Sequence, residues 1–318
     1  MFEATRLVFY YAVSPVHMGA GSAIGAIDNP IQREVHTQHP IFAGSGIKGA
    51  LRHHFNRRWS GERGKNGQSL VSRIFGPPTN ASDHAGAFSV SDAQLAVLPV
   101  RSLKGAFVYA TCPLALGRLK RFAELAGVPV DWSVENVQAQ QALTASDSAV
   151  SSGSVILESF EFSRAEGDCV KIAAWLADNA LPAAPSHKFF ADKLRTDLIV
   201  LSDTDFAHFA RHGMAVEPHV RINDESGTAD DGGLFYTENL PPESILVGLA
   251  QASLERFKKT GEETGPARLD ADAILSHIFE GAGSDRPGIA NKALQIGGDA
   301  TTGRGLVIVR PVGEDTGA

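Results

Sequence analysis

The stretch S-P-V-H-M-G-A-G-S-A-I-G-A-I-D-N-P-I-Q-R-E-V-H-T-Q-H-P-I-F-A-G-S-G-I-K-G-A-L-R-H-H-F-N-R-R, residues 14–58, is the part around which the rest of the chain is organised. An apolar run ends where it begins, and a glycine-rich loop follows that carries the acid Asp28. A helix is then predicted to begin at Gly44-Ser45-Gly46. A loop as long as residues 14–43 is more often functional than inert, so we expect the chemistry of the protein here.

Three glycines at the start of that helix, Gly44, Gly46 and Gly49, satisfy the pattern G-x-G-x-x-G of dinucleotide-binding proteins. That motif also requires an acid about 20 residues further on. Residues 69–73 contain no acid, which excludes the dinucleotide interpretation. What remains is a helix N-terminus opened by glycine, whose free N–H groups suit a phosphate.

Charge is unevenly distributed along the 318 residues. The net charge of −7 argues against indiscriminate binding of nucleic acid, but net charge hides local patterning. Lys48 and Arg52 lie one turn apart on the first helix, on the same face. The basic residues of segment 48–73 are Lys48, Arg52, Arg57, Arg58, Arg63, Lys65 and Arg73, and its acid is Glu62. Acids are concentrated later, for instance in Asp203, Asp205, Asp224, Glu225, Asp230 and Asp231. The sequence thus predicts a local basic patch that binds a phosphate backbone.

Composition places the chain among soluble globular proteins, with 43% hydrophobic and 20% charged residues. The two cysteines, Cys112 and Cys169, have neither metal-ligand spacing nor the pattern of a disulfide framework, which fits a reducing cytosol. No run approaches 18 consecutive apolar residues, and the N-terminus lacks the pattern of a signal peptide. We therefore expect a cytoplasmic protein without a membrane partner.

Hydrophobic patterning predicts a mixed α+β chain forming a single domain, residues 1–318. Its first five elements are strand, helix, strand, strand and helix, as in a split βαβ unit of the ferredoxin-like type. The predicted strands are 5–14, 87–99, 107–111, 154–162, 198–201, 216–222, 234–240, 244–254 and 306–310. The predicted helices are 45–59, 113–125, 170–179, 203–212 and 270–280, with Asp203 as the expected N-cap of the fourth.

Three further segments have their own character. Residues 61–67, G-E-R-G-K-N-G, are typical of a flexible basic turn. Residues 127–197 are rich in alanine and serine and are predicted to be an insertion. Residues 216–242 are predicted to form a long, projecting β-hairpin with the acidic turn N-D-E-S-G-T-A-D-D-G-G, and Pro241-Pro242 is a stiff hinge at its end.

The closing loop, residues 297–305, superficially resembles a phosphate-binding loop. A P-loop requires Gly-Lys-Ser/Thr and then a helix, whereas Gly303-Arg304-Gly305 leads into a strand, so no ATP site is predicted. The loop is either a tight turn or a set of backbone N–H groups that, with Arg304, hold a phosphate or pack against the first helix. We favour the second interpretation.

Candidate catalytic residues are few. His36-x-x-His39 has no second ligand pair of matching spacing, so no metal site is predicted from it. His17 is either a hydrogen-bonded turn histidine or a contact to a nucleic-acid backbone near Asp28. Asp28, in G-A-I-D-N-P, also suits turn chemistry, which its spacing alone favours. The residues by themselves indicate an RNA- or phosphate-binding protein with an exposed acid in a flexible loop.

Taken together, several stretches resemble the RAMP superfamily of CRISPR effector proteins, most closely the backbone subunits of type III-B (Cmr) complexes. They are H-M-G-A-G-S-A-I-G-A-I-D-N-P-I-Q-R-E, G-S-G-I-K-G-A-L-R, L-P-V-R-S-L-K-G-A-F-V-Y-A-T-C-P, L-F-Y-T-E-N-L-P-P-E-S-I and Q-I-G-G-D-A-T-T-G-R-G. The resemblance covers essentially the whole chain. Ala300 departs from the family's pattern, in which an acid is expected in this loop.

The resemblance implies a ferredoxin-like, RNA-recognition-motif-like palm with an inserted helical region, residues 127–197, and a thumb hairpin, residues 216–242. It implies copies stacked head-to-tail along a guide (CRISPR) RNA, together with other Cmr subunits, in a cytoplasmic antiviral complex. The residues expected to contact RNA are Ser45, Lys48, Arg52, Arg57, Arg101, Arg221 and Arg304.

The resemblance also implies an endoribonuclease that cleaves complementary single-stranded target RNA at regular intervals. Asp28 matches the family's catalytic acid, and His17, Tyr236 and Glu238 are further candidates. Attack by the adjacent 2′-hydroxyl on its own phosphodiester needs in-line geometry more than a strong base. A carboxylate with an unperturbed pKa of ~3.9 is a weak base, so orienting that hydroxyl or holding a divalent cation suits it equally. Mg²⁺ is the expected ion, with undefined ligands.

Two other functions stay open. The chain is also compatible with a purely structural guide-RNA-binding backbone, in which Asp28 only shapes a loop. A guide-processing nuclease of the same superfamily would use a catalytic histidine on the palm, and His17 is the residue placed for it.

Overall fold

The computed structural model describes residues 2–23, 25–59, 69–79, 84–133, 136–256 and 268–312, so the basic turn predicted at residues 61–67 lies outside the described residues. The strands are β1 (Ala4–Ala12), β2 (Ile41–Phe42), β3 (Phe88–Val90), β4 (Ala93–Arg101), β5 (Phe107–Thr111), β6 (Gln141–Thr144), β7 (Val150–Ser151), β8 (Ser154–Leu157), β9 (Phe160–Arg164), β10 (Leu198–Leu201), β11 (Ala215–Ile222), β12 (Ala229–Asn239), β13 (Ile245–Ala252), β14 (Lys292–Gln295) and β15 (Leu306–Val312). The helices are α1 (Gly44–Arg58), α2 (Leu70–Phe75), α3 (Pro113–Leu125), α4 (Val170–Ala180), α5 (Lys188–Asp197), α6 (Asp203–His212) and α7 (Ala271–Phe279), with 3-10 turns η1 (Pro185–His187) and η2 (Ala300–Thr302).

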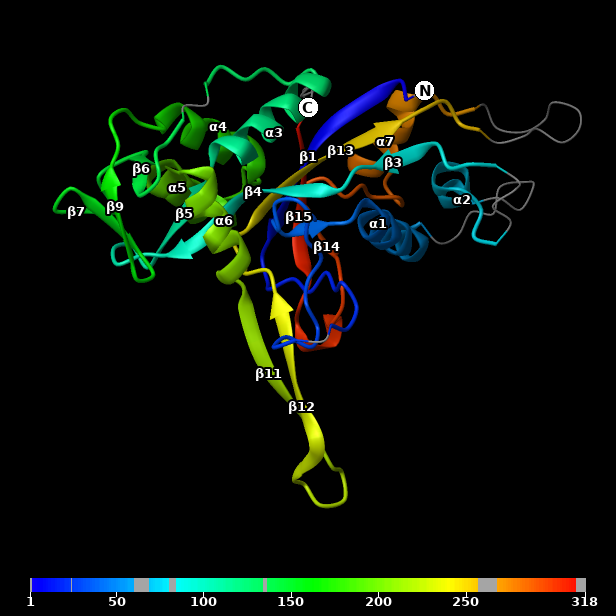
Figure 1. The fold of residues 1–318 in the computed structure, drawn as a ribbon. Coiled ribbons are helices and arrows are strands. Elements are labelled where there is room, and N and C mark those ends of the chain that lie inside the picture. The colour runs from blue at the N-terminus through cyan, green and yellow to red at the C-terminus, as the bar shows by residue number, and fades with distance from the viewer. Residues whose placement is uncertain are drawn as a thin grey trace, which may run out of the picture.

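The predicted α+β class is confirmed, because a large mixed sheet carries helices on both of its faces (Figure 1). The sheet order is β14-β15-β1-β13-β4-β5-β10-β6-β9-β8-β7, and β2 and β3 pair with β4 and β13. The β5–β10 and β6–β9 pairs are parallel and the other pairs are antiparallel.

Strand β1 lies in the interior of the sheet, between β13 and β15. Its side chains alternate between two cores: Val8 and Tyr10 point to one face, and Leu7 and Phe9 to the other. All four are buried, which is why this strand is a continuous apolar run in the sequence.

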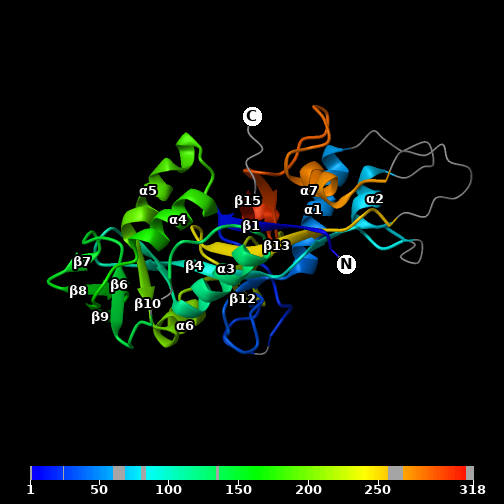
Figure 2. The ribbon, with the colours of Figure 1, turned by 90° about the horizontal axis from the view of Figure 1, so that it is seen from above.

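The helices divide between the two faces. Helices α1, α2, α6 and α7 contribute to the core that contains Val8, and α3, α4 and α5 contribute to the core that contains Leu7. Helix α1 packs through Ile47, Leu51 and Phe55, which follow one another at four-residue intervals along one stripe. Figure 2 shows α1, α2 and α7 grouped at one end of the molecule and α4 and α5 at the other.

The strand order differs in one respect from a simple ferredoxin-like unit. The five predicted elements occur in the expected order as β1, α1, β3–β4, β5 and α3. However, β13 lies between β1 and β4, so the first strand does not pair with the strands that follow α1. The reason is burial: all but one residue of β13 is buried, so this late strand needs a partner on each side.

One predicted strand and one predicted helix cap differ from the structure. The strand predicted over 154–162 is a hairpin of β8 and β9, which turns at Glu158, where φ is +52°. The predicted insertion therefore contains sheet strands as well as α4 and α5. The N-cap of α6 is Ser202, whose hydroxyl accepts a hydrogen bond from the Asp205 N–H. Asp203, predicted as the cap, instead accepts a bond of 2.8 Å from the N–H of Leu114 at the start of α3.

Strands β11 and β12 form an antiparallel hairpin that projects away from the sheet (Figure 1). The pairing includes Pro218 with Tyr236 and Val216 with Glu238. Two loops lie beside its base, one between β1 and β2 and the other between β14 and β15. This base is the point where the predicted catalytic residues meet.

Candidate active site and nucleic-acid interface

The Asp28 loop lies along strand β12 at the base of the hairpin. The Asn29 N–H donates a 3.0 Å bond to the Tyr236 carbonyl, and the Glu238 N–H donates a 3.0 Å bond to the Asn29 carbonyl. These bonds form a short parallel bridge between Asn29 and Thr237. The loop is therefore bonded to β12 at the hairpin base through an isolated bridge.

The Asp28 side chain bonds to the hairpin. Its Oδ2 atom accepts a hydrogen bond of 2.8 Å from the Tyr236 N–H, and the residue is half-buried. An aspartate that only shaped its own turn would bond to its own loop. This contact fixes the orientation of the carboxylate relative to β12.

His17 lies between the hairpin and the closing loop. Its Nδ1 atom is 2.7 Å from the Glu238 carbonyl, and the His17 carbonyl accepts a 2.9 Å bond from the Gly298 N–H. Because a carbonyl only accepts, Nδ1 carries the hydrogen, and Nε2 of the neutral ring is left as an acceptor. Gly297 has φ of +81°, and a Cβ there would come within 2.3 Å of the His17 carbonyl oxygen, so this approach requires glycine.

Glu238, predicted as a catalytic candidate, lies inside the protein with 3% of its surface exposed. Its Oε1 atom is 2.5 Å from Nη2 of Arg33, and its Oε2 atom accepts a 3.0 Å bond from the Ile31 N–H. These partners occupy both oxygens, so the carboxylate of Glu238 is bonded within the protein. Glu238 holds the Arg33 side chain and the backbone of Ile31 in place.

The hairpin has an apolar outer face. Leu234 and Tyr236 are exposed on it, and they pair with Val220 and Pro218. Phe235 lies on the opposite face, because side chains alternate along a strand. There it stacks on His219, with ring centroids 5.2 Å apart.

The other predicted RNA contacts are dispersed. Arg304 forms an ion pair with Glu217 of β11, so the closing loop is bonded to the hairpin. Arg221 is exposed on β11. Arg101 is exposed but pairs with Glu158 at 2.9 Å, at the end of the sheet that carries the predicted insertion.

The glycines that open α1 are explained by packing. A Cβ on Gly44 would lie 2.6 Å from the Val90 carbonyl, and one on Gly46 would lie 3.1 Å from Sδ of Met18. The Gly44 N–H already donates a 2.8 Å bond to Asp92. The expectation that all the N–H groups of this helix N-terminus are available to a phosphate is therefore wrong in part, although Ser45 beside it is exposed.

Lys48 and Arg52 follow on α1, and both are partly buried. Burial lowers the pKa of Lys48, and the neighbouring charge of Arg52 lowers it further. Arg52 donates a 2.9 Å bond to the Gly76 carbonyl after α2. Arg52 thus holds two helices together in addition to any role with RNA.

The second half of α1 lines a basic pocket of about 560 Å³ against β14 and η2. Its lining residues include no acid; they are Ala50, His53, His54, Arg57, Arg58, Leu294, Gln295 and Ala300. Burial lowers the pKa of His54, as do Arg58 and Lys292. Patterning identified Arg57, but it could not predict that β14 closes this pocket, because β14 is a short strand of mixed composition.

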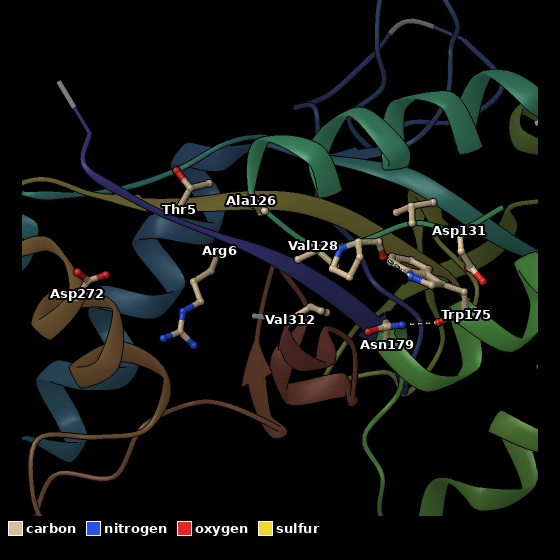
Figure 3. A pocket seen from close by; sticks show the side chains of 12 residues that line it. Thr5, Arg6, Ala126, Val128, Asp131, Trp175, Asn179, Asp272 and Val312 are labelled. Atoms are coloured by element: carbon tan, nitrogen blue, oxygen red, sulfur yellow. Dashed lines mark hydrogen bonds between the residues drawn. The ribbon is translucent and has the colours of Figure 1, made fainter. Parts of the chain in front are cut away.

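A different pocket, of about 920 Å³, lies beside β1, α4 and the loop after α3 (Figure 3). Arg6, Trp175 and Asp272 are among its lining residues. None of the predicted catalytic or RNA-binding residues lines it, so we assign it no part in the chemistry.

Among the described ranges, no group of three or more histidine, cysteine, aspartate or glutamate side chains could hold a metal ion. The single carboxylate of Asp28 suits a Mg²⁺ ion that keeps several waters and takes its remaining ligands from phosphates. Within the same ranges, no helix is long and apolar enough to cross a membrane.

Residues 9–308 match the model of the RAMP superfamily. The chain is 34% identical over 304 residues to a CRISPR system Cmr endoribonuclease, Cmr4, of Pyrococcus furiosus, covering 95% of this chain and 94% of that protein. It is 26% identical to a CRISPR system CMR subunit, Cmr4, of Saccharolobus solfataricus, with the same coverage.

Solved structures agree with these relatives. The crystal structure of oligomeric Cmr4 from Pyrococcus furiosus superposes with a TM-score of 0.69 at 26% identity, over 98% of this chain and 99% of that one. A chain of the type III-B Cmr-beta complex bound to cognate target RNA gives a TM-score of 0.69 at 18% identity, over 98% of both chains. The second likeness shows the fold alone.

Proposed function

The chain belongs to the RAMP superfamily, and from this premise we propose that it is the backbone subunit of a type III-B CRISPR effector complex that cleaves target RNA. Its relative in Pyrococcus furiosus carries the name endoribonuclease, and that relative's structure is described as oligomeric. In the proposed complex, copies of this chain stack head-to-tail along a guide RNA beside other Cmr subunits. Each copy binds guide RNA, and together they cut complementary single-stranded RNA at regular intervals.

The observation that carries the proposal is the arrangement at the hairpin base. Asp28 and His17 come from different turns of one loop, and both bond to β12, at Tyr236 and at Glu238. The backbone groups of residues two apart on a strand point to the same edge of that strand, so both side chains bond to one edge of β12.

The proposed reaction is attack of a target 2′-oxygen on the adjacent phosphorus. The phosphorus–5′-oxygen bond breaks, and the products are a 2′,3′-cyclic phosphate and a 5′-hydroxyl. Asp28 orients the 2′-hydroxyl, and the unprotonated Nε2 of His17 accepts its proton, which is finally delivered to the leaving 5′-oxygen. Positioning of this kind supplies much of the acceleration that an in-line displacement needs.

RNA binding extends over two surfaces. The basic pocket that Arg57 lines and Lys48 on the same helix hold guide phosphates, while the exposed residues Leu234 and Tyr236 contact an unstacked target base. If a Mg²⁺ ion takes part, Asp28 and RNA phosphates would hold it, and it would neutralise charge that develops on the phosphate.

A purely structural backbone subunit is the second candidate. The bond from the Tyr236 N–H to Asp28 favours it, because a structural aspartate makes contacts of this kind. The two functions differ in whether the charge of Asp28 matters once the loop is formed.

The test is Asp28→Asn in the fully assembled complex. Asparagine keeps an oxygen that can accept the Tyr236 N–H, so the loop should stay in place. We expect guide and target binding within a factor of a few of wild type, and cleavage of labelled complementary RNA slower by ~10²-fold or more, because the 2′-hydroxyl is no longer oriented. Cleavage at the wild-type rate would leave the structural backbone as the function.

A further inference from the structure

Arg33 lies at a junction of three elements. Its guanidinium donates to the Gln38 carbonyl at 2.7 Å, within its own loop. It also donates to the carbonyls of Ala210 at 2.8 Å and Arg211 at 3.3 Å, near the end of α6. Its Nη2 atom forms the 2.5 Å ion pair with Glu238 of β12. The planar fork of arginine suits several fixed acceptors at once.

Glu238, which Arg33 holds in place, bonds to His17 and to residues next to Asp28, the two catalytic candidates. Its Oε2 atom accepts the N–H of Ile31, three residues after Asp28. Its carbonyl is the partner of the His17 ring, and its N–H bonds to Asn29, next to Asp28. A shift of Glu238 would therefore move both residues relative to the hairpin.

Burial makes the arrangement sensitive to the loss of Arg33. Its side chain is 13% exposed and that of Glu238 is 5% exposed. Removing one partner of a buried ion pair leaves an uncompensated charge, which the structure relieves by rearrangement or by taking up a proton. Either response weakens the bonds that Glu238 makes to the catalytic loop.

We propose that Arg33 is a positioning residue for RNA cleavage, which acts through Glu238 to hold Asp28 and His17 in register with the hairpin. It does not touch RNA. The inference rests on the proposed function, in which Asp28 takes part in cleavage. It also gives the buried Glu238 a role, which is to link Arg33 to the loop that carries Asp28.

The test compares two arginines of similar burial. Arg118 is 11% exposed and pairs with Glu34 at 2.8 Å, so it holds the residue next to Arg33. Its partner Glu34 bonds to Thr37 of the same loop and not to β12. Arg118→Met is therefore the matched control for Arg33→Met.

The measurements are single-turnover cleavage at saturating target RNA and target affinity, both in assembled complexes. We expect Arg33→Met to slow cleavage by about 10²-fold, the effect of a misplacement of roughly 1 Å, with affinity within a factor of a few. Arg118→Met should cleave nearly as wild type does. Equal losses in the two variants would mean general destabilisation of the loop and would overturn the inference.

A combination with Asp28→Asn separates this inference from the proposed function. If Arg33 acts by placing Asp28 and His17, Arg33→Met should slow the Asp28→Asn complex far less than it slows the wild type. If the two substitutions instead slowed cleavage by independent factors that multiply, this outcome would contradict an action of Arg33 through Asp28 and His17. If Asp28→Asn is inactive while Arg33→Met cuts at the wild-type rate, only the role of Arg33 fails. If Asp28→Asn itself cuts normally, the proposed function fails.

A second variant covers the case in which Arg33→Met does not assemble. The pair Arg33→Met with Glu238→Met replaces both buried charges by apolar side chains of similar length, which often preserves stability. It removes the acceptor for the Ile31 N–H, so we expect an assembled complex that cuts slowly. Wild-type cleavage by this double variant would show that the junction does not position the catalytic loop.

Discussion

The carboxylate of Asp28 accepts a 2.8 Å hydrogen bond from the backbone N–H of Tyr236, 208 positions later in the chain. This bond ties the acid of the first loop to the base of the projecting hairpin. Any movement of the hairpin base is therefore transmitted to Asp28.

Shortening the hairpin should alter where target RNA is cut more than how guide RNA is bound. The tip bonds mainly to itself, for example between Asn223 and Thr228 and between Gly227 and Asn223. Replacing residues 222–232 by a two-residue Asn-Gly turn puts Arg221 opposite Gly233, which continues the Val220–Leu234 register, so the base, with Asp28 and Tyr236, should stay folded. Mapping of cleavage products on a labelled target checks this, with guide affinity as the internal control. An unchanged cleavage pattern would leave the tip without a role in target distortion.

Removing basic residues of α1 should weaken guide binding in a salt-dependent way. Each lost phosphate contact should make the slope of log affinity against log salt shallower by about 0.7 for a single strand. We expect Lys48→Ala with Arg57→Ala to show a change of up to twice that value. The matched control is Lys171→Ala with Lys188→Ala, which removes two exposed lysines at the other end of the molecule. If both double variants had the same slope of log affinity against log salt, α1 would not be part of the RNA interface.

Chelation of divalent cations should affect cleavage and not assembly. Asp28 offers a single carboxylate, so a bound Mg²⁺ ion would depend on phosphates of the paired RNA. We expect EDTA to slow cleavage by the assembled complex and added Mg²⁺ to restore it, while guide affinity stays the same. Full activity in EDTA would indicate that the RNA and the protein side chains suffice.

Glu243 should make the protein less stable as the pH rises. Burial raises the pKa of this carboxyl from 4.5 to about 7, and the hydroxyls of Tyr11 and Tyr109 contact the same oxygen, Oε2. Between these two pH values the folded state binds more protons than the unfolded state. The free energy of unfolding therefore falls as the pH rises through this window.

Replacing Glu243 by glutamine should remove that loss. At the upper end of the window we expect Glu243→Gln to melt about 2 °C above the wild type, which corresponds to roughly 1 kcal/mol in a chain of this size. At the lower end the two should melt together. The control is Glu255→Gln: hydrogen bonds from Arg73 outweigh burial and lower the pKa of Glu255, so this change should destabilise the protein. If the melting temperatures of Glu243→Gln and of the wild type changed in parallel with pH, the pH dependence would not come from Glu243.

The sequence alone determined the elements with strong local signals. Helix α3 begins at Pro113 and ends at Leu125, as predicted, because proline suits the first helical position and an apolar stripe follows. Strand β1 and the hairpin strands were recognisable from their β-branched and aromatic content. Asp28 was found because it is the acid of the glycine-rich first part of a long loop, and the family resemblance gave it a role.

Only the tertiary structure decided which residues meet. That β13 lies beside β1, and that Glu238 lies inside while Tyr236 lies outside, follows from pairings between segments far apart in the chain. A hydrophobic period indicates which face of a strand is buried, but it does not identify the partner strand. The junction of Arg33 with Glu238 joins residues 205 positions apart, and no local pattern encodes such a contact. Burying the two charges costs desolvation free energy, and their attraction offsets that cost only where the folded chain holds them close together.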